Sequence, residues 1–344
     1  MKRIFIGYNN EAGVGSRLKE GFAKLKYKAD FYSFHKHSFG YKADKIVKLP
    51  EVRIFKILKM IYFTFFLAIN FDYFIFISSG SLFRGRYDLR FFRFLKKPLM
   101  IIHTGCDIRI PEKVKDLKWN PCERCTTEYK DYVNCKISEK EKTLEIEKQL
   151  FDFIVIPAEL SSSMIAEHYL MHWPVDLTNF PDSNLQSFTT KKRLKILHAP
   201  SNEIYKGSKY IYNAIEQLKD KYDFEFKIVK NLPIQELYEE ILSSDLIIDQ
   251  MGGYYGLLSI ESMALYKPVV VYIYDQIWSD IKNDCPLINA NPDNLYHILE
   301  DIILNPEQLE IIGKKSREFV EKYHSDEVIA TNLIKIFEGS LKSV

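Results

Sequence analysis

The chain has 344 residues, of which 47% are hydrophobic and 27% are charged. This balance predicts a folded protein of about two domains, because one domain usually has ~100–200 residues, and it excludes a disordered, collagen-like or repetitive fibrous chain. The formal net charge of +2 argues against a uniformly basic nucleic-acid-binding protein.

The charge is distributed unevenly along the chain. Residues 1–100 carry 20 Lys and Arg against 7 Asp and Glu, a formal charge of +13, whereas residues 101–344 carry 28 against 39, or −11. Such a split indicates either an anionic partner for the N-terminal third, such as a membrane surface, phosphate groups or nucleic acid, or simply a solvated basic face.

The start of the chain and the cysteine content both indicate the cytoplasm. Met1-Lys2-Arg3 leads directly into Ile4–Ile6, a run too short for the core of a secretory signal. Five cysteines in a chain of this length do not form a disulfide framework, so a reducing compartment is expected. We expect a cytoplasmic protein, or a peripheral one on the inner face of the cytoplasmic membrane.

The first half of the chain alternates short apolar runs with helical patterns. The expected strands are Ile4–Ile6, Phe74–Ile77, Leu99–Ile102 and Phe153–Ile156. The expected helices between them are Gly15–Leu25, Ile54–Ile69 and Glu139–Leu150. Continuous β-rich runs of this kind suit buried parallel strands, and their alternation with helices predicts a doubly wound α/β domain.

The most apolar stretch lies within this half, from Ile54 to Ile77. Lys56, Lys59, Asn70 and Asp72 interrupt it. Its segment Ile57–Ile69 has 13 residues and contains Lys59, which is shorter than the ~20 residues that cross a bilayer. Basic residues flank this stretch. We expect either a core helix or a helix that docks on an anionic membrane surface.

The pattern lapses around residues 178–193, which we interpret as a linker between domains 1–185 and 190–325. A second series follows, with strands expected at Lys195–His198, Glu225–Val229, Leu246–Asp249 and Pro268–Tyr272. Its helices are expected at Ser208–Lys219, Ile234–Ser243, Leu257–Leu265, Pro292–Leu304 and Pro306–Tyr323. A last helix in 326–344 is expected to pack back on the first domain. Two Rossmann-like domains facing a central cleft would bring their strand-end loops together there.

The segment after the strand at Lys195–His198 has the composition of a phosphate site. Ser201 and Asn202 precede Lys206-Gly207, just before a helix. Lysine supplies charge, glycine allows close approach, and a helix N-terminus supplies unpaired N–H groups. The alternative is a surface lysine in a turn.

A second such segment follows the strand that ends at Asp249. Gly253-Tyr-Tyr-Gly256 leads into a helix that carries Glu261 one turn further on. Backbone N–H groups at Gly256 suit a diphosphate, and a carboxylate at the position of Glu261 suits the hydroxyls of a ribose. The alternative is an exposed helix glutamate.

Together these segments resemble the C-terminal domain of retaining GT-B glycosyltransferases, in particular family 4. The family pattern is Glu-Gly-Phe-Gly-Leu, three variable residues, Glu-Ala-Met-Ala, then Gly-Lys-Pro-Val-Val. The chain retains Gly256, Leu257, Glu261, Met263, Ala264, Lys267, Pro268, Val269 and Val270, and Lys206-Gly207 matches the family's Lys-Gly element. The likeness covers residues 194–324 well and the N-terminal half only loosely.

The resemblance implies roles for individual residues. Lys206, His103 and Glu261 would be catalytic, and Asp107 and Arg109 would face the acceptor, because His103-Thr-Gly-Cys-Asp-Ile-Arg109 resembles an element of some family members. The implied donor-binding residues are Gly13, Gly15, Ser201, Asn202, Lys206, Gly207, Leu232, Gly253, Tyr255, Gly256, Leu257 and Glu261. A strand-end structural histidine and a plain glycine turn are the alternatives for His103 and for Gly13 with Gly15.

The chain also departs from the family pattern. The first acidic residue of the pattern falls at Gly253, Tyr254 and Tyr266 replace family glycines, and Glu203 stands near the place of a family arginine. The departure at Gly253 removes the carboxylate that the family uses on the donor sugar.

Four cysteines, Cys106, Cys122, Cys125 and Cys135, fall close together in the chain, and the Cys122-x-x-Cys125 spacing is one that structural zinc sites use. The outer spacings are irregular, so we expect no metal for catalysis and keep a structural zinc as an alternative.

These patterns predict a glycosyltransferase of EC class 2.4 that moves a sugar from a nucleotide-sugar, UDP-linked rather than GDP-linked, with no further cofactor. The expected acceptor is a cell-envelope glycan or a lipid-linked molecule, and the resemblance implies retention of configuration. The alternatives are a non-hydrolysing nucleotide-sugar epimerase, a non-catalytic nucleotide-binding homologue in an envelope-assembly complex, and a nucleic-acid-binding protein, although no nucleic-acid motif is present.

Overall fold

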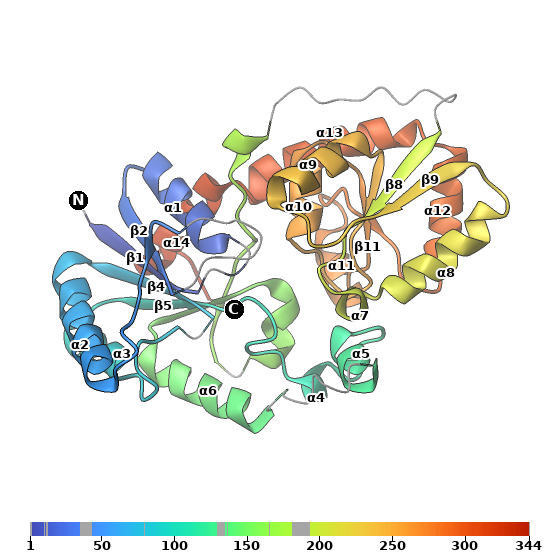
Figure 1. The fold of residues 1–344 in the computed structure, drawn as a ribbon. Helices are drawn as coiled ribbons and strands as arrows, with labels where there is room; N and C mark the ends of the chain where they lie inside the picture. Colours follow the sequence, from blue (N-terminus) through green and yellow to red (C-terminus); the bar gives the residue numbers. More distant parts are fainter. Residues whose placement is uncertain are drawn as a thin grey trace. The chain divides into compact units, whose positions relative to one another are not determined.

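The computed structural model describes residues 2–9, 11, 13–34, 43–78, 80–128, 135, 137–164, 166–180 and 193–343. The chain divides into two compact units (Figure 1). The first contains Met1–Ile110, Lys136–Asp176 and Ser325–Val344, and the second contains Pro111–Cys135 and Leu177–His324. Most of the expected linker, residues 181–192, lies outside the described residues.

The first unit is built on a parallel sheet of seven strands in the order β3-β2-β1-β4-β5-β6-β7. The strands are β1 (Arg3–Tyr8), β2 (Lys28–Ser33), β3 (Lys45–Ile46), β4 (Tyr73–Ile77), β5 (Leu99–Ile102), β6 (Phe153–Ile156) and β7 (Tyr169–Leu170). The helices are α1 (Val14–Lys24), α2 (Arg53–Asn70), α3 (Tyr87–Phe94), α6 (Ile137–Leu150) and α14 (Asp326–Phe337), with 3-10 turns η1 (Ala158–Ser163) and η2 (Leu177–Asn179), the latter in the second unit.

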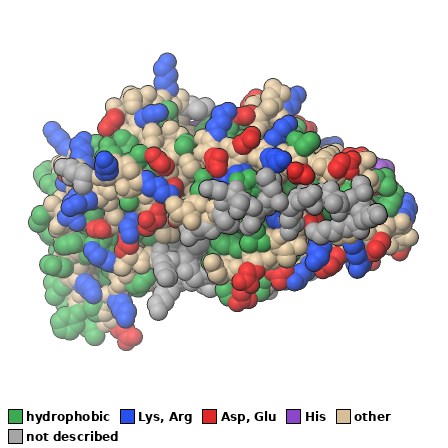
Figure 2. Space-filling view, turned by 90° about the horizontal axis from the view of Figure 1, so that it is seen from above, with side chains coloured by type: hydrophobic (Ala, Val, Ile, Leu, Met, Phe, Trp, Pro, Cys, Tyr) green, Lys and Arg blue, Asp and Glu red, His purple; other side chains and the backbone are tan. Residues whose placement is uncertain are grey.

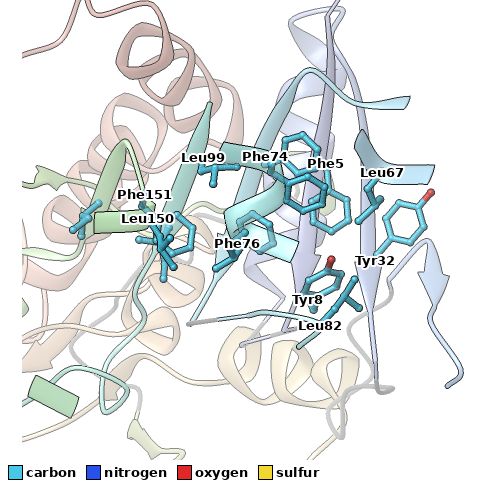
Figure 3. Packing of buried hydrophobic residues seen from close by; sticks show 14 of the residues in the cluster. Phe5, Tyr8, Tyr32, Leu67, Phe74, Phe76, Leu82, Leu99, Leu150 and Phe151 are labelled. Carbon is cyan, nitrogen blue, oxygen red and sulfur yellow. The ribbon is translucent and has the colours of Figure 1, made fainter. Parts of the chain in front are cut away.

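The core of this unit is unusually aromatic on one face of the sheet. Phe5, Phe74 and Phe76 project from neighbouring strands and pack with Tyr32 and with Leu67 of α2 (Figure 3). Helices α2, α3 and α6 cover this face, and α1 and α14 lie together on the other (Figure 1). Burial on both faces explains why these strands are continuous apolar runs.

The second unit is built on a parallel sheet in the order β12-β11-β10-β8-β9. The strands are β8 (Leu194–His198), β9 (Phe224–Ile228), β10 (Leu246–Ile248), β11 (Val269–Val271) and β12 (Ile288–Asn289). The helices are α4 (Pro111–Val114), α5 (Pro121–Glu128), α7 (Glu203–Lys206), α8 (Ser208–Lys219), α9 (Ile234–Ser243), α10 (Leu257–Ala264), α11 (Asp275–Ile281), α12 (Leu295–Leu304) and α13 (Gln308–Tyr323).

Both units therefore have the doubly wound architecture that the sequence predicts. In the second unit α8 and α12 cover one face of the sheet, while α9, α10 and α13 lie on the other (Figure 1). The loops that leave β8 and β10 emerge at the carboxyl end of neighbouring strands, since the two strands are parallel and paired. This edge is where an open α/β sheet binds its ligands.

One segment of the expected first domain belongs to the second compact unit. Residues 111–135 fall within the expected first domain, 1–185, but α4 and α5 group with the second unit. The contact between α5 and α7 accounts for this.

None of the helices in the described part of the chain combines the length and apolarity that crossing a bilayer requires.

Candidate functional site

The loops after β8 and β10 meet at a buried carboxylate. Asp249, the residue after β10, has no exposed surface. Its Oδ1 atom accepts a hydrogen bond from Lys206 Nζ at 3.0 Å, and its Oδ2 atom accepts from Ser259 Oγ at 2.7 Å and from the Gly256 amide at 3.2 Å. The two segments with phosphate-site patterns therefore converge on one residue, Asp249, that lies in neither pattern.

The ionisation of Asp249 is set by two opposing effects. Burial raises the pKa of its carboxyl group, but the charge of Lys206 and the hydrogen bonds from Ser259 and Gly256 outweigh it, so the net pKa is lowered. The carboxylate is thus an anion held by a lysine, a hydroxyl and a helix-end amide. These are the donor types that bind phosphate oxygens in proteins.

Lys206 retains one N–H donor beyond its two contacts within the described residues. Its Nζ donates to Asp249 and to the side-chain oxygen of Gln250, which uses two of the three N–H bonds of an ammonium group. Its side chain is 13% exposed, so the group is shielded but reachable. Its role toward a donor phosphate stays a prediction.

The turn that carries Lys206 is built from local signals. Asn202 caps α7 by accepting from the Tyr205 amide at 2.8 Å. Gly207 then adopts a left-handed φ of 70°, and a Cβ there would lie 3.1 Å from Met251 Cβ. The Met251 amide donates to the Lys206 carbonyl at 2.9 Å, which fixes this turn to the loop that leaves β10.

Arg124 is a member of this site that sequence analysis missed. It is buried, and its guanidinium donates to the carbonyls of Ile204 at 2.9 Å and Tyr205 at 2.8 Å, in the short helix that ends at Lys206. It also donates to the Trp119 carbonyl at 2.7 Å. No sequence pattern around Cys122-Glu-Arg-Cys125 predicts that Arg124 binds the α7 backbone. These contacts form only when α5 packs on α7.

The turn at Gly256 begins α10 as expected. Gly256 is the N-cap residue, and a Cβ on it would lie 3.4 Å from Lys206 Nζ and 3.6 Å from Asp249 Oδ2. Leu257 is the first residue of the helix. The lysine, the helix start and the glycine that lets them approach are therefore adjacent within the second unit.

One predicted donor-binding residue, Tyr255, has a side chain that faces the protein interior. Tyr255 is buried, and its hydroxyl lies 3.3 Å from Nε2 of His324. A contact of Tyr255 with a donor would thus involve its backbone. Gln250, which the prediction omitted, holds this loop by donating to the Tyr254 carbonyl while accepting from Lys206.

The structure explains why position 253 is a glycine and not the acidic residue of the family pattern. Gly253 has a φ of 89°, and a Cβ there would lie 2.0 Å from Cζ of the Tyr274 ring. The Tyr274 amide also donates to the Gly253 carbonyl at 2.9 Å. The ring of Tyr274 thus occupies the space into which an acidic side chain at position 253 would begin to extend.

Glu261 lies on the buried face of α10, so the alternative of an exposed helix glutamate is wrong. Its Oε1 accepts from the Tyr238 hydroxyl of α9 at 3.1 Å. Leu232, in the segment that leads from β9 to α9, is half-buried, and Ser201 is exposed.

The remaining predicted residues belong to the first unit. Gly13 is the left-handed N-cap of α1, with a φ of 76°, and a Cβ at Gly15 would lie 2.5 Å from the Phe31 ring. Gly15 thus permits close packing of α1 on β2, and its predicted contact with a donor stays a prediction.

His103 lies at the end of β5, fully buried between two carboxylates. Its Nδ1 is 2.8 Å from Asp107 Oδ2 and its Nε2 is 3.5 Å from Glu147 Oε2. Burial raises the pKa of Asp107, but the hydrogen bond and charge of His103 outweigh it and the net shift is downward. The geometry fits a histidine that holds the 103–109 loop, and its catalytic role stays a prediction.

Arg109 is also buried. Glu159 in η1 has its pKa raised to about 7 because burial disfavours its charge, and Arg109 opposes that shift. The proposed acceptor role of Asp107 and Arg109 stays a prediction. Among the residues that the structure describes, no group of three His, Cys, Asp or Glu side chains is placed to hold a metal ion.

No protein-family model matches this sequence, and no curated protein matches it. Solved structures do resemble it in fold. Sucrose-phosphate synthase of Thermosynechococcus elongatus superposes with a TM-score of 0.65 at 13% identity, covering 98% of this chain and 99% of that chain. HepE of Anabaena, in complex with UDP and glucose, gives 0.64 at 11% identity, with 98% and 100% covered.

An α-glucosyltransferase in complex with UDP gives a TM-score of 0.64 at 10% identity, with 98% of this chain and 100% of that chain covered. Likeness at this level of identity concerns the fold. The chain therefore has the GT-B fold over nearly its whole length, which the sequence pattern had indicated mainly for residues 194–324.

Proposed function

We propose that the protein is a glycosyltransferase that uses a UDP-sugar as donor. The observation that carries this proposal is the convergence of Lys206 and the Gly256 amide on one buried anionic group at the strand ends of the second unit. A site that holds a carboxylate with an ammonium group and a helix-end amide is suited to a diphosphate. Similarity to structures solved with UDP, including HepE and the α-glucosyltransferase, supports the choice of base.

In this proposal Lys206 acts on the leaving group. The bond between the sugar's anomeric carbon and the β-phosphate oxygen breaks, and negative charge grows on the diphosphate. The ammonium of Lys206 and the amides that open α10 stabilise that charge as it develops, which lowers the barrier to transfer. Glu261 would bind the ribose.

The new bond forms between an acceptor hydroxyl oxygen and the same anomeric carbon, and the hydroxyl proton passes to the departing phosphate. We propose retention of configuration, which the resemblance to retaining GT-B enzymes implies. Attack is proposed on the face from which the phosphate leaves, because position 253 is a glycine and supplies no carboxylate for a covalent intermediate. The acceptor is proposed to be a cell-envelope glycan or a lipid-linked molecule.

A melting-temperature panel of UDP, GDP, ADP and CMP tests the donor site, because a ligand that binds only the folded state raises the melting temperature. We expect the largest rise with UDP. If none of these nucleotides changes the melting temperature at millimolar concentration, the donor site is wrong.

A product assay separates transfer from its alternatives. UDP-sugars are incubated with the protein in the presence and absence of a lipid and glycan extract. Release of UDP that requires the extract supports a transferase. An epimerised sugar formed from donor alone indicates an epimerase, and activity that is equal in wild type and Lys206→Met contradicts the proposed role of Lys206.

A further inference from the structure

Helix α2 has two apolar faces. Met60, Thr64, Leu67 and Ala68 are buried against the sheet. On the other side of the helix, Phe55, Leu58, Tyr62, Phe65 and Ile69 follow one another at spacings of three and four residues, and each is between 51% and 81% exposed. We call these five residues the apolar stripe.

The stripe continues onto α3. The Phe65 ring packs edge-on against the Phe91 ring with centroids 5.0 Å apart, and Tyr87 and Phe94 of α3 are largely exposed. Hydrophobic side chains interspersed with lysines and arginines gather at the left of the molecule in Figure 2, the side on which α2 and α3 lie in Figure 1. A contiguous exposed apolar surface of this kind marks an interaction site.

The exposed charged side chains that α2 and α3 carry are all basic. Lys56 and Lys59 of α2 and Arg90 and Lys96 near α3 are exposed, and within the described residues none of them forms an ion pair. From Arg53 to Asn70 the helix carries no acidic residue. The face is thus apolar and cationic at once.

We propose that this face docks on an anionic phospholipid bilayer, with α2 lying in the plane of the interface. The lysines would meet lipid headgroups, while the stripe would enter the boundary between headgroups and acyl chains. The buried face of α2 stays on the sheet, so docking needs no unfolding of the first unit.

Other occupants fit this chemistry less well. A second copy of the chain would bring Lys56 and Lys59 of two helices together, and like charges repel. A nucleic acid would engage the cations through its phosphates but would leave five large apolar side chains without a partner. The bilayer satisfies both halves of the surface.

The test measures cosedimentation of the purified full-length protein with vesicles of phosphatidylcholine alone and of phosphatidylcholine mixed equally with phosphatidylglycerol. Binding to the mixed vesicles and weak binding to the neutral ones are expected. Raising the salt concentration should weaken binding, because salt screens the headgroup charge. No donor is present, so the result does not depend on the proposed function.

Two variants separate the two contributions. Leu58→Gln combined with Tyr62→Gln and Ile69→Gln should abolish binding to mixed vesicles. Lys56→Gln combined with Lys59→Gln should weaken it at least roughly fivefold, since each lysine near an anionic surface adds measurable affinity.

Matched controls use exposed residues of the second unit. Leu304→Gln with Ile311→Gln, and Lys282→Gln with Lys315→Gln, remove similar groups elsewhere and should bind like wild type. Circular dichroism checks that every variant is folded.

Three results would overturn the proposal. One is equal binding to neutral and mixed vesicles, or none to either. Another is unchanged binding by the apolar-stripe variant. The third is a competing use of this face: either a dimer seen by light scattering or binding of an oligonucleotide in preference to vesicles. In either case the apolar-stripe or lysine substitutions would abolish the dimer or the oligonucleotide binding.

Discussion

Asp249 gives the candidate site its character at the scale of single residues. It has no exposed surface and is ionised by virtue of Lys206, Ser259 and the Gly256 amide. Removing one member of a buried ion pair costs ~3–5 kcal/mol, because the other charge stays buried without compensation. Lys206 therefore has a structural duty in addition to its proposed one.

A double-mutant cycle separates these two duties. Lys206→Met alone should lower the free energy of unfolding by roughly 3 kcal/mol, and Asp249→Asn combined with it should restore most of that loss, because the uncompensated carboxylate is gone. Denaturant unfolding of wild type, Lys206→Met, Asp249→Asn and the double variant measures the cycle. Additive losses would show that the pair is not coupled.

Gly253 is a second position where the addition of one atom, a Cβ, is expected to change the stability of the protein. Gly253→Ala places a Cβ 2.0 Å from the Tyr274 ring at a φ of 89°, so we expect it to destabilise the second unit by at least about 2 kcal/mol. Its neighbour provides the control, because a Cβ on Gly252 would have its nearest contact at 3.6 Å. Equal melting temperatures for Gly253→Ala and Gly252→Ala would contradict this packing.

His198 makes stability depend on pH. Its Nδ1 lies 2.8 Å from the Ile248 carbonyl, which can only accept, so Nδ1 carries a proton. Its Nε2 lies 2.8 Å from Ser208 Oγ and accepts from that hydroxyl when the ring is neutral. Burial lowers the pKa of His198 to about 4. In the unfolded chain its pKa is about 6.5, so between these values only the unfolded state binds the proton.

The contribution of His198 to the free energy of unfolding is therefore complete above about pH 6.5 and is lost as the pH falls toward about 4. Denaturant unfolding of wild type and His198→Asn across this range measures it. The variant should show the smaller pH dependence. Exposed His297→Asn is the control and should follow wild type; identical slopes for His198→Asn and wild type would contradict the assignment.

At the scale of elements, α5 shows how a segment distant in sequence builds the site. Arg124 reaches three backbone carbonyls, two of them in α7, and lysine cannot reproduce that fork of donors. Both Arg124→Gln and Arg124→Lys should weaken UDP binding and lower the melting temperature, since α7 would no longer hold Lys206 in place.

Titration calorimetry with UDP checks this, with exposed Arg93→Gln of the first unit as the control. Unchanged UDP affinity in Arg124→Lys would mean that α7 does not need the guanidinium.

The elements also show what periodicity can and cannot predict. All eight predicted strands are present. Seven of them are central strands, which in a parallel sheet are mostly apolar runs, and the eighth, β9, lies at an edge with the mixed sequence FEFKI. The short edge strands β3, β7 and β12, and β2 with its mixed KADFYS sequence, were missed. Short helices such as α5 and α7 carry too few residues to establish a period.

The same limit applies to the site. Lys206, Gly256 and Glu261 lie in sequence patterns that have a local physical reason, so the sequence could mark them as candidates. In the sequence, Asp249 and Gln250 simply follow an apolar strand. Their place in the candidate site depends on contacts with Lys206, which lies 43 and 44 positions earlier in the chain. Contacts of this kind exist only in the folded chain.

At the scale of the whole molecule, the chain has a GT-B fold of two parallel sheets, and its charge is divided between them. The basic N-terminal third includes the exposed, cationic and apolar face of α2 and α3, while the proposed diphosphate site belongs to the second unit. We infer that the first unit docks the protein on the membrane and the second unit binds the donor.

The most direct test compares titration calorimetry of UDP and uridine with wild type and with the Lys206→Met, Asp249→Asn double variant, which keeps the site free of an uncompensated charge. We predict that wild type binds UDP at least roughly tenfold more tightly than uridine, and that the double variant loses this preference, because a charge-assisted hydrogen bond to phosphate is gone. An undiminished preference for UDP in the folded double variant would contradict the proposed diphosphate site.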